Sequence, residues 1–439
     1  MLNPLRHQLP AYSPISLRSI LKALPQAVGG VPDPIGGLEA LLRERHPGRE
    51  VVLVGSGTQA LTLALQLASQ NLDPATPIAL PAYSCFDVAT AAVALGRPVD
   101  FYDLDPVSLG PDPSSLEAVL GRGARVVVLA PLFGMPLDWG VLDPVLARGG
   151  EMRGEGAGSG AGEGVRVIED AAQGFGGEWA GAPLGSQGHL GILSFGRGKG
   201  WTGGGAGGAL LMPEEEWGRA MEVLEGVGMS DLRAVEAKGG EAIARTGTKH
   251  GVTGTKAFLQ AVGLWGLARP GIYRVPRSLP LGLGETRYRE PEPIRPLSQA
   301  EAALVLAAYS PALAAVETRR RVAREYGQDL EDLAARGGGP FRVPVVPPAA
   351  TPGYLRFPLR PFQGMEAFRY PEQARRLGVE TGYPRILPDL MSLKALVEDG
   401  GSQEVYPGAV ALRDGLITLP THPRTRKGER RRLVEMLRL

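Results

Sequence analysis

Between residues 50 and 212, short runs of apolar residues alternate with stretches in which apolar side chains recur every three or four positions. A short apolar run bounded by Gly, Pro or Asp predicts a buried strand, and the wider spacing predicts a helix with one buried face. Their alternation is typical of a mostly parallel sheet covered by helices. We therefore predict an α/β fold with a seven-stranded sheet, whose strands span 51–54, 78–81, 99–102, 126–130, 165–168, 193–195 and 209–212.

The length of the chain predicts two domains, because 439 residues exceed one ordinary hydrophobic core. We divide it into an N-terminal segment, a large domain and a smaller α+β domain, over 1–49, 50–290 and 291–439. Within the large domain, 213–290 is an insertion with a helix over 256–267, and it is a candidate wall of the substrate pocket. Glycine-rich residues 149–164 predict a surface loop without an assigned function. The smaller domain should hold one or two helices, a strand and a final basic helix, over 301–334, 355–359 and about 425–437.

Composition narrows the class of protein. A hydrophobic fraction of 44%, a charged fraction of 21% and a net charge of +1 are those of a globular protein without a preference for nucleic acid or anionic membranes. The longest nearly apolar stretch, 302–316, is shorter than the roughly 18 apolar residues that a membrane span needs. Met1–Pro14 lacks the pattern of a secretory signal. We expect a cytoplasmic protein without a membrane span, and one cysteine and five scattered histidines give no support for a disulfide or a metal site.

The first candidate for chemistry is Gly55-Ser56-Gly57-Thr58, which joins the first strand to a helix expected over 58–71. Free backbone N–H groups and the positive dipole end at a helix N-terminus favour a phosphate, and small residues allow it to approach. A dinucleotide-binding fingerprint is a rival interpretation, but the third glycine of that pattern is missing. A Walker-type loop fails because no lysine follows at the required position.

The second candidate is Glu169-Asp170, which follows the strand 165–168. In open α/β sheets, ligands bind where the parallel strands end. A carboxylate there can bond the protonated ring nitrogen of a pyridine cofactor and keep it cationic, which suits Asp170. Position alone makes it equally plausible that Asp170 caps a following helix. Gln173, three residues further, is near enough to address the same ligand.

The third candidate is Lys199, which lies in a glycine-dense loop, Gly196-Arg197-Gly198-Lys199-Gly200, directly after a short strand. A lysine amine forms an imine with an aldehyde, whereas the guanidinium of arginine does not. In isolation the residue would be interpreted as a solvated loop lysine. Its position after the two other candidates changes that interpretation.

Taken in order over about residues 50–212, these elements resemble the DegT-type (DegT/StrS) sugar aminotransferases, a branch of the fold-type-I pyridoxal-phosphate (PLP) enzymes. Weaker echoes follow at 377–379 and 419–423. Order and spacing, more than any single motif, carry the resemblance. The motifs are Ser56-Gly57-Thr58 with Ala60-Leu61, Pro81-Ala82-Tyr83, Glu169-Asp170-Ala171-Ala172-Gln173, and Ser194-Phe195 with Ser194 five residues before Lys199.

The resemblance implies a role for each of these positions. Lys199 would hold PLP as a Schiff base and act as the catalytic base. Asp170 would bond the pyridine nitrogen and Gln173 the ring hydroxyl. Three further residues would hold the phosphate: Gly57, Thr58 and Ser194.

Several positions depart from the family pattern. An aromatic side chain after Pro81 normally stacks on the cofactor ring, but Cys85 occupies the aligned position, so the candidates are Tyr83 and Phe86. The substrate side differs more than the cofactor side. There, Gly200 replaces a frequent Asn, His189 a common Asp, and 203–208 lacks the usual Glu.

By resemblance, we expect a homodimeric aminotransferase that moves an amino group from an amino acid, glutamate, to a keto acceptor, a nucleotide-linked keto sugar. One alternative is another reaction on the same cofactor. Dehydratase relatives replace the anchoring lysine with histidine, so Lys199 argues against that branch. A second alternative is a non-catalytic PLP-binding sensor of the same fold, and a third is an NAD-dependent Rossmann oxidoreductase.

Overall fold

A computed structural model describes residues 7–27, 33–151, 164–227, 251–269, 288–338, 341–397 and 406–437. Its centre is a seven-stranded sheet with the strand order β1-β9-β8-β5-β4-β2-β3, which confirms the predicted fold class. All seven predicted strands are present with shifts of a few residues at their ends. They are β1 (Arg49–Val54), β2 (Ile78–Pro81), β3 (Val99–Tyr102), β4 (Val126–Leu129), β5 (Arg166–Asp170), β8 (Leu190–Ser194) and β9 (Gly208–Pro213).

The sheet is mostly parallel. Strands β3, β2, β4, β5 and β8 pair in parallel, and β9 runs antiparallel to both β1 and β8. Strands β1, β5 and β8 therefore end at the same edge of the sheet. This register places the turn after Val54 together with Asp170 and Ser194, and ligands bind at such an edge.

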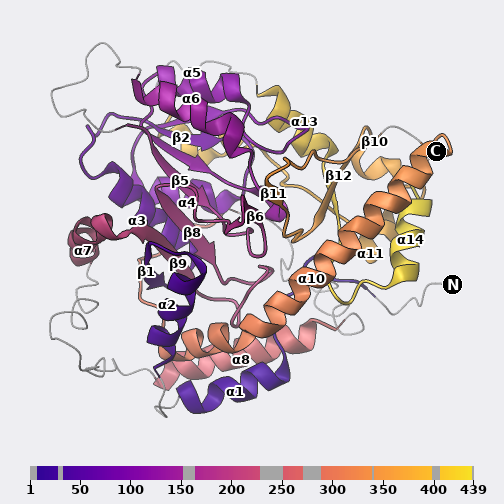
Figure 1. The fold of residues 1–439 in the computed structure, drawn as a ribbon, viewed down its shortest axis with the longest axis horizontal. Helices are drawn as coiled ribbons and strands as arrows, with labels where there is room; N and C mark the ends of the chain where they lie inside the picture. Colours follow the sequence, from indigo (N-terminus) through magenta and orange to yellow (C-terminus); the bar gives the residue numbers. More distant parts are fainter. Residues whose placement is uncertain are drawn as a thin grey trace.

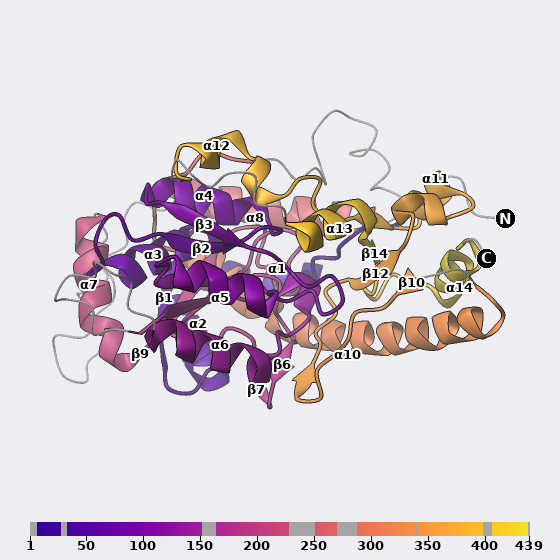
Figure 2. The same cartoon turned by 90° about the horizontal axis from the view of Figure 1, so that it is seen from above.

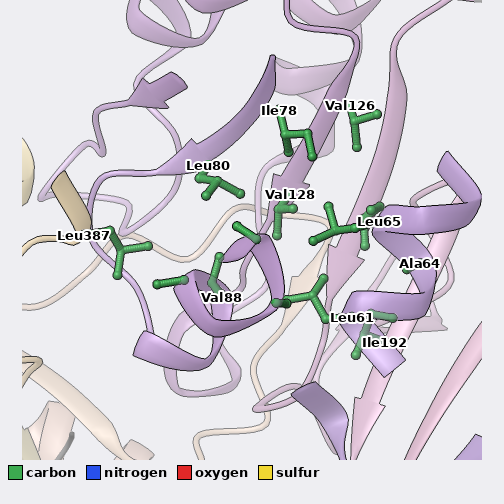
Figure 3. Packing of buried hydrophobic residues seen from close by; sticks show 14 of the residues in the cluster. Leu61, Ala64, Leu65, Ile78, Leu80, Val88, Val126, Val128, Ile192 and Leu387 are labelled. Carbon is green, nitrogen blue, oxygen red and sulfur yellow. The ribbon is translucent and has the colours of Figure 1, made fainter. Parts of the chain in front are cut away.

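Helices cover both faces of the large sheet. On one face, α3 (Gly57–Ser69) and α4 (Phe86–Leu95) pack on side chains of the strands that are even-numbered, except in β3, where Val99 and Phe101 lie on this face. Figure 3 shows Leu61 and Leu65 of α3 beside Val128 and Ile192 of the sheet. The other face is covered by α2 (Pro34–Arg45), α5 (Pro113–Gly121) and α6 (Trp139–Glu151). Burial on both faces explains why the strands are almost continuously apolar.

A second, four-stranded sheet forms the core of the C-terminal region, in the order β10-β12-β14-β13. Its strands are β10 (Phe341–Arg342), β12 (Phe357–Pro361), β13 (Glu380–Thr381) and β14 (Ile417–Leu419). The helices of this region are α11 (Pro371–Arg376), α12 (Met391–Lys394), α13 (Pro407–Gly415) and α14 (Lys427–Glu435). A short third sheet joins β11 (Ala350–Thr351) to β6 (Glu178–Trp179) and β7 (Ala182–Pro183).

One continuous helix, α10 (Gln299–Ala335), links the two regions. It begins with a capping box in which Ser298 and Glu301 satisfy each other's backbone N–H groups. Its first half packs beside α2, α1 (Leu17–Ala27) and α8 (Gly251–Leu267), and its second half packs in the core of the small sheet (Figures 1 and 2). Residues of α10 therefore pack in the cores of both regions, and the division predicted at 290/291 stays a prediction.

Residues of the predicted small domain also pack against the large sheet. Leu387 and Leu393 come from the C-terminal region, yet they pack in the core of the large sheet against α4. Of the predicted insertion 213–290, the described parts include α7 (Trp217–Gly226) and α8. Most of the predicted loop 149–164 lies outside the described residues, and α6 continues to Glu151.

Within the described part of the chain, one helix is long and apolar enough to cross a membrane by length and composition. This helix is α10, and 56% of its most apolar window is buried inside the protein. A buried core helix meets the same criteria. The packing of α10 on both sheets accounts for its apolar character.

Candidate active site

A cavity of about 740 Å³ opens at the edge of the sheet where β1, β5 and β8 end. Its walls come from the turns that follow these strands and from the loops after β2 and β4. Seven of the eight predicted site residues line it, although they are spread over more than 140 positions. These residues are Gly57, Thr58, Phe86, Asp170, Gln173, Ser194 and Lys199.

The N-terminus of α3 forms one end of the cavity. Ser56 caps the helix, and its Oγ accepts the N–H of Gln59 at 3.2 Å. Gly57 follows, and a Cβ there would stand 2.6 Å from the Cβ of Ser194, so only glycine allows β8 to approach this closely. The N–H groups of a first helical turn have no partner within the helix. Gly57, Thr58 and Ser194 therefore form a cradle suited to an anion.

Asp170 is the last residue of β5. No helix begins after it, because residues 171–177 form turns, so the capping alternative finds no support. One carboxylate oxygen, Oδ1, accepts the N–H of Ala172 at 3.1 Å. Burial raises the pKa of the Asp170 carboxyl, and the nearby ammonium of Lys199 opposes that rise. A cation placed against this carboxylate would stabilise its charged form.

Gln173 is held by two hydrogen bonds that fix the orientation of its amide. The backbone N–H of Phe133 donates to its Oε1 at 2.8 Å, and its Nε2 donates to the hydroxyl of Tyr383 at 2.6 Å. Phe133 has a φ of 55°, a left-handed conformation that is uncommon outside glycine. This conformation costs free energy, and here it accompanies the hydrogen bond from the Phe133 N–H to Gln173.

Sequence reasoning missed Tyr383, which follows β13 and lines the cavity from the C-terminal region. Its ring packs edge-on against Tyr83, with the centroids 5.4 Å apart, and its backbone N–H donates to the Tyr83 hydroxyl at 2.7 Å. Burial raises the pKa of the Tyr383 hydroxyl, which keeps it neutral and able to donate a hydrogen bond. No local pattern points to this residue, because its role depends on a contact across more than 200 positions.

The two aromatic candidates for stacking lie in different places. Tyr83 is fully buried and does not line the cavity. Its hydroxyl occupies the space that a Cβ at Gly382 would need, so it packs against the segment that follows β13. Phe86 lines the cavity as the first residue of α4, and so does Cys85, whose Sγ donates to Asp87 at 3.4 Å. Burial raises the pKa of the Cys85 thiol to about 12, which keeps it protonated.

The loop that carries Lys199 is fastened on several sides. Ser194 Oγ accepts the N–H of Gly196 at 3.3 Å, and Ser13 Oγ of the N-terminal segment accepts the N–H of Gly198 at 3.1 Å. Beyond the lysine, the indole of Trp201 donates to the carbonyl of Val305 in α10 at 2.8 Å. These bonds give the lysine a defined position in a glycine-rich loop.

One helix of the predicted insertion and the residues around its predicted end also line the cavity. Helix α8 contributes Gln260, Gly263, Leu264 and Leu267, and the segment that follows contributes Arg289, Glu290, Pro291 and Glu292. Among the predicted departures, the structure places Gly205 at the wall, whereas His189 lies elsewhere and accepts the N–H of Val167 at 3.1 Å. No group of three or more His, Cys, Asp or Glu side chains in the described ranges is placed to hold a metal ion.

Curated relatives match somewhat less than half of the chain. A 3-amino-5-hydroxybenzoate synthase from Amycolatopsis mediterranei (strain S699) is 27% identical over 211 residues, or 47% of this chain and 50% of that protein. A UDP-N-acetyl-3-dehydro-alpha-D-glucosamine 3-aminotransferase from Acidithiobacillus ferrooxidans is 28% identical over 174 residues, or 39% of this chain and 42% of that protein. The chain thus spans about half the length of the curated relatives that it matches.

A likeness to solved structures covers almost the whole chain. The Spr1654 protein of Streptococcus pneumoniae, in its PLP-form, aligns with a TM-score of 0.71 at 17% identity over 98% of each chain. At that identity the likeness shows the fold alone. The profile of one family matches residues 34–269, a range from α2 to α8 that includes every predicted site residue, and this confirms the resemblance drawn from the motifs. This chain belongs to the DegT/DnrJ/EryC1/StrS aminotransferase family.

Proposed function

We propose that this protein is a PLP-dependent aminotransferase that moves an amino group from an amino acid to a keto acceptor. The observation that carries the proposal is the content of one cavity. It combines the amine of Lys199, the buried carboxyl of Asp170, the fixed amide of Gln173 and the anion cradle at the start of α3. These four features would bind, in that order, an aldehyde, a ring nitrogen, a ring hydroxyl and a phosphate.

PLP, when bound, would supply an aldehyde that links to primary amines and a ring that draws electrons from a substrate carbon. The chain supplies the rest. Lys199 would provide the amine that anchors the cofactor and would move a proton at the donor's α-carbon. Asp170 provides negative charge for the ring nitrogen, and Gln173 provides an amide N–H for the ring hydroxyl. Gly57, Thr58 and Ser194 would hold the phosphate by backbone and hydroxyl groups.

The first test asks whether Lys199 is the anchor. Protein incubated with PLP is reduced with borohydride and digested, and the peptides are weighed by mass spectrometry. We expect the added cofactor mass on the Lys199 peptide, its loss in Lys199→Ala, and its retention in the control Lys22→Ala, because Lys22 lies exposed on α1. Cofactor fixed at another lysine, or at none, would refute the assignment.

The second test asks whether the site transfers amino groups. Loaded protein is mixed with glutamate, or with glutamine, in the absence of an acceptor, and pyridoxamine phosphate is measured. We propose glutamate as the donor and expect stoichiometric conversion. A protein that fixes PLP at Lys199 but converts no amino acid is instead a non-catalytic sensor. A product other than pyridoxamine phosphate would indicate another PLP reaction.

We propose a nucleotide-linked keto sugar as the acceptor and a homodimer as the assembly. The acceptor proposal is supported by the name of the UDP-N-acetyl-3-dehydro-glucosamine relative and by the mixed charges at the wall, Arg289, Glu290 and Glu292. Incubation of the aminated enzyme with a panel of nucleotide-linked and free keto sugars would separate the two acceptor classes. Sedimentation velocity would report whether the protein is a dimer.

A further inference from the structure

Helix α10 reaches the turn that follows Gln173 through two neighbouring arginines. Arg319 donates from Nη2 to the carbonyl of Phe175 at 3.0 Å, and Arg320 donates from Nη2 to the carbonyl of Gly176 at 2.7 Å. Arg320 is partly exposed and also contacts Glu178. Arg319 is different, because only 3% of its surface is exposed.

The same guanidinium lies against the loop that carries Lys199. A Cβ at Gly200, the residue after the lysine, would stand 2.6 Å from Nη1 of Arg319 and 3.2 Å from its Nη2. The second contact of that Cβ position is Phe175, also at 3.2 Å. Arg319 thus fills the space that any side chain at residue 200 would need. The absence of a side chain at Gly200 is therefore what makes room for the buried guanidinium of Arg319.

The environment of Arg319 is costly for a cation. Its described hydrogen bond goes to a main-chain carbonyl, and its Nε is buried without a partner in the structure. Burial, with a smaller contribution from Arg320, lowers the pKa of the Arg319 guanidinium to about 10. A buried charge is unfavourable unless polar partners compensate it. Packing alone would be better served by an apolar side chain of similar size.

We propose that Arg319 is a positioning residue that ties the turn after Gln173 to the loop of Lys199, and thereby sets the lysine against Asp170. The tie runs through one rigid helix. The second half of α10, including Val322 and Tyr326, is fixed in the core of the small sheet. The inference rests on the proposed function for its meaning in catalysis, but the tie itself is a property of the chain.

The test compares Arg319→Met and Arg319→Lys with Arg321→Met. Arg321 lies two positions further on the same helix, with its side chain 56% exposed, and pairs with Glu325. Hydrogen–deuterium exchange is measured without cofactor on peptides that cover 171–177 and 196–202. We expect Arg319→Met to speed exchange in both peptides, Arg319→Lys to speed it less, and Arg321→Met to change neither. Unchanged exchange in either peptide of a folded Arg319→Met protein overturns the tie.

A double-mutant cycle tests the contact with Gly200. Gly200→Ala should destabilise the protein with Arg319 present and be tolerated in the Arg319→Met background, so that thermal midpoints are not additive. Additive midpoints would mean that the two residues do not share the space, and the proposal would fail. This arm keeps the test valid if one single variant folds poorly, since the paired variant should fold better.

A third measurement separates positioning from stability. In the folded Arg319→Met protein we expect PLP affinity to fall by about tenfold or more, the effect of losing one charged hydrogen bond, and the borohydride-fixed fraction on Lys199 to fall with it. Faster exchange without any change in PLP affinity would show a purely structural arginine and overturn the positioning role. If the wild type binds no PLP, the proposed function fails, and the tie is decided by exchange and the double-mutant cycle.

Discussion

At the scale of single residues, the candidate site depends on glycines that admit their neighbours as much as on groups that bind. Gly57 lies against Ser194, and Gly200 lies against Arg319. In both places the missing side chain lets two segments approach that a Cβ would hold apart. The sequence predicts Lys199 and Asp170 through the order and spacing of the motifs that contain them, whereas the close approach that each glycine permits appears only when its partner is known.

Gly57→Ala provides a prediction at this scale. The added Cβ would stand 2.6 Å from the Cβ of Ser194, so β8 or the start of α3 must shift and the anion cradle opens. We expect PLP affinity to fall by at least about tenfold, which corresponds to a loss of about 1.4 kcal/mol in binding free energy. Fluorescence or absorbance titration measures it.

The control for this substitution is Gly218→Ala in α7, where an added Cβ meets no atom within 4 Å. Both variants exchange a helical glycine for alanine, so propensity favours each of them equally. Equal PLP affinity in the two variants would show that the approach of Gly57 to Ser194 does not shape the phosphate end.

At the scale of elements, the spacing of apolar residues and the turn residues between them predicted the large sheet well. They predicted the contacts between elements poorly. All seven strands and α3 follow from apolar runs and from the turn residues beside them. Tyr383 and Arg319 could not be found in this way, because each acts through a partner more than 100 positions away. Tyr83, one of the two predicted stacking candidates, fills the space beside Gly382 and does not line the cavity. A local pattern contains no information about such a fit.

Residues 10–13 of the N-terminal segment show the same limit, because they form a strap between the small sheet and the lysine loop. Arg356 donates to the carbonyls of Pro10, Gly378 and Thr418, and Ser13 of the strap binds the loop at Gly198. The buried guanidinium of Arg356 thus holds the strap on the small sheet through these hydrogen bonds.

Arg356→Met should release the strap at its point of attachment. Because several bonds to a buried charge are lost, we expect a loss of about 3 kcal/mol in the free energy of unfolding, together with faster proteolysis near the N-terminus. The control is Arg336→Met at the exposed end of α10, where the side chain binds only the carbonyl of Asp332 among its described hydrogen bonds. Thermal melts and limited trypsin digestion measure both effects, and an N-terminus that stays protected would refute the strap.

At the scale of the whole molecule, both sheets pack against α10, and residues of the C-terminal region pack in the core of the large sheet. The candidate site should therefore be lost when the fold unfolds. Its sensitivity to acid should reflect a residue that does not line the cavity. His46 lies between α2 and β1, is buried, and contacts Ser186 Oγ through Nδ1 at 2.7 Å. Burial, with the charges of Arg45 and Arg49, lowers the pKa of His46 to about 3.

The sign of the effect follows from where the proton binds. Below about pH 6.5, the unfolded chain protonates this histidine while the folded protein does not until about pH 3. The free energy of unfolding should therefore decrease with falling pH by about 1.4 kcal/mol per unit in that window. His46→Gln removes this titration, so the thermal midpoint of the wild type should lose its lead over the variant between pH 7.5 and pH 5. Ser186→Ala is the matched control, because it removes the same hydrogen bond and keeps the titrating ring, and it should retain the slope of the wild type. Parallel pH profiles for wild type and His46→Gln would show that the acid sensitivity of the fold arises elsewhere.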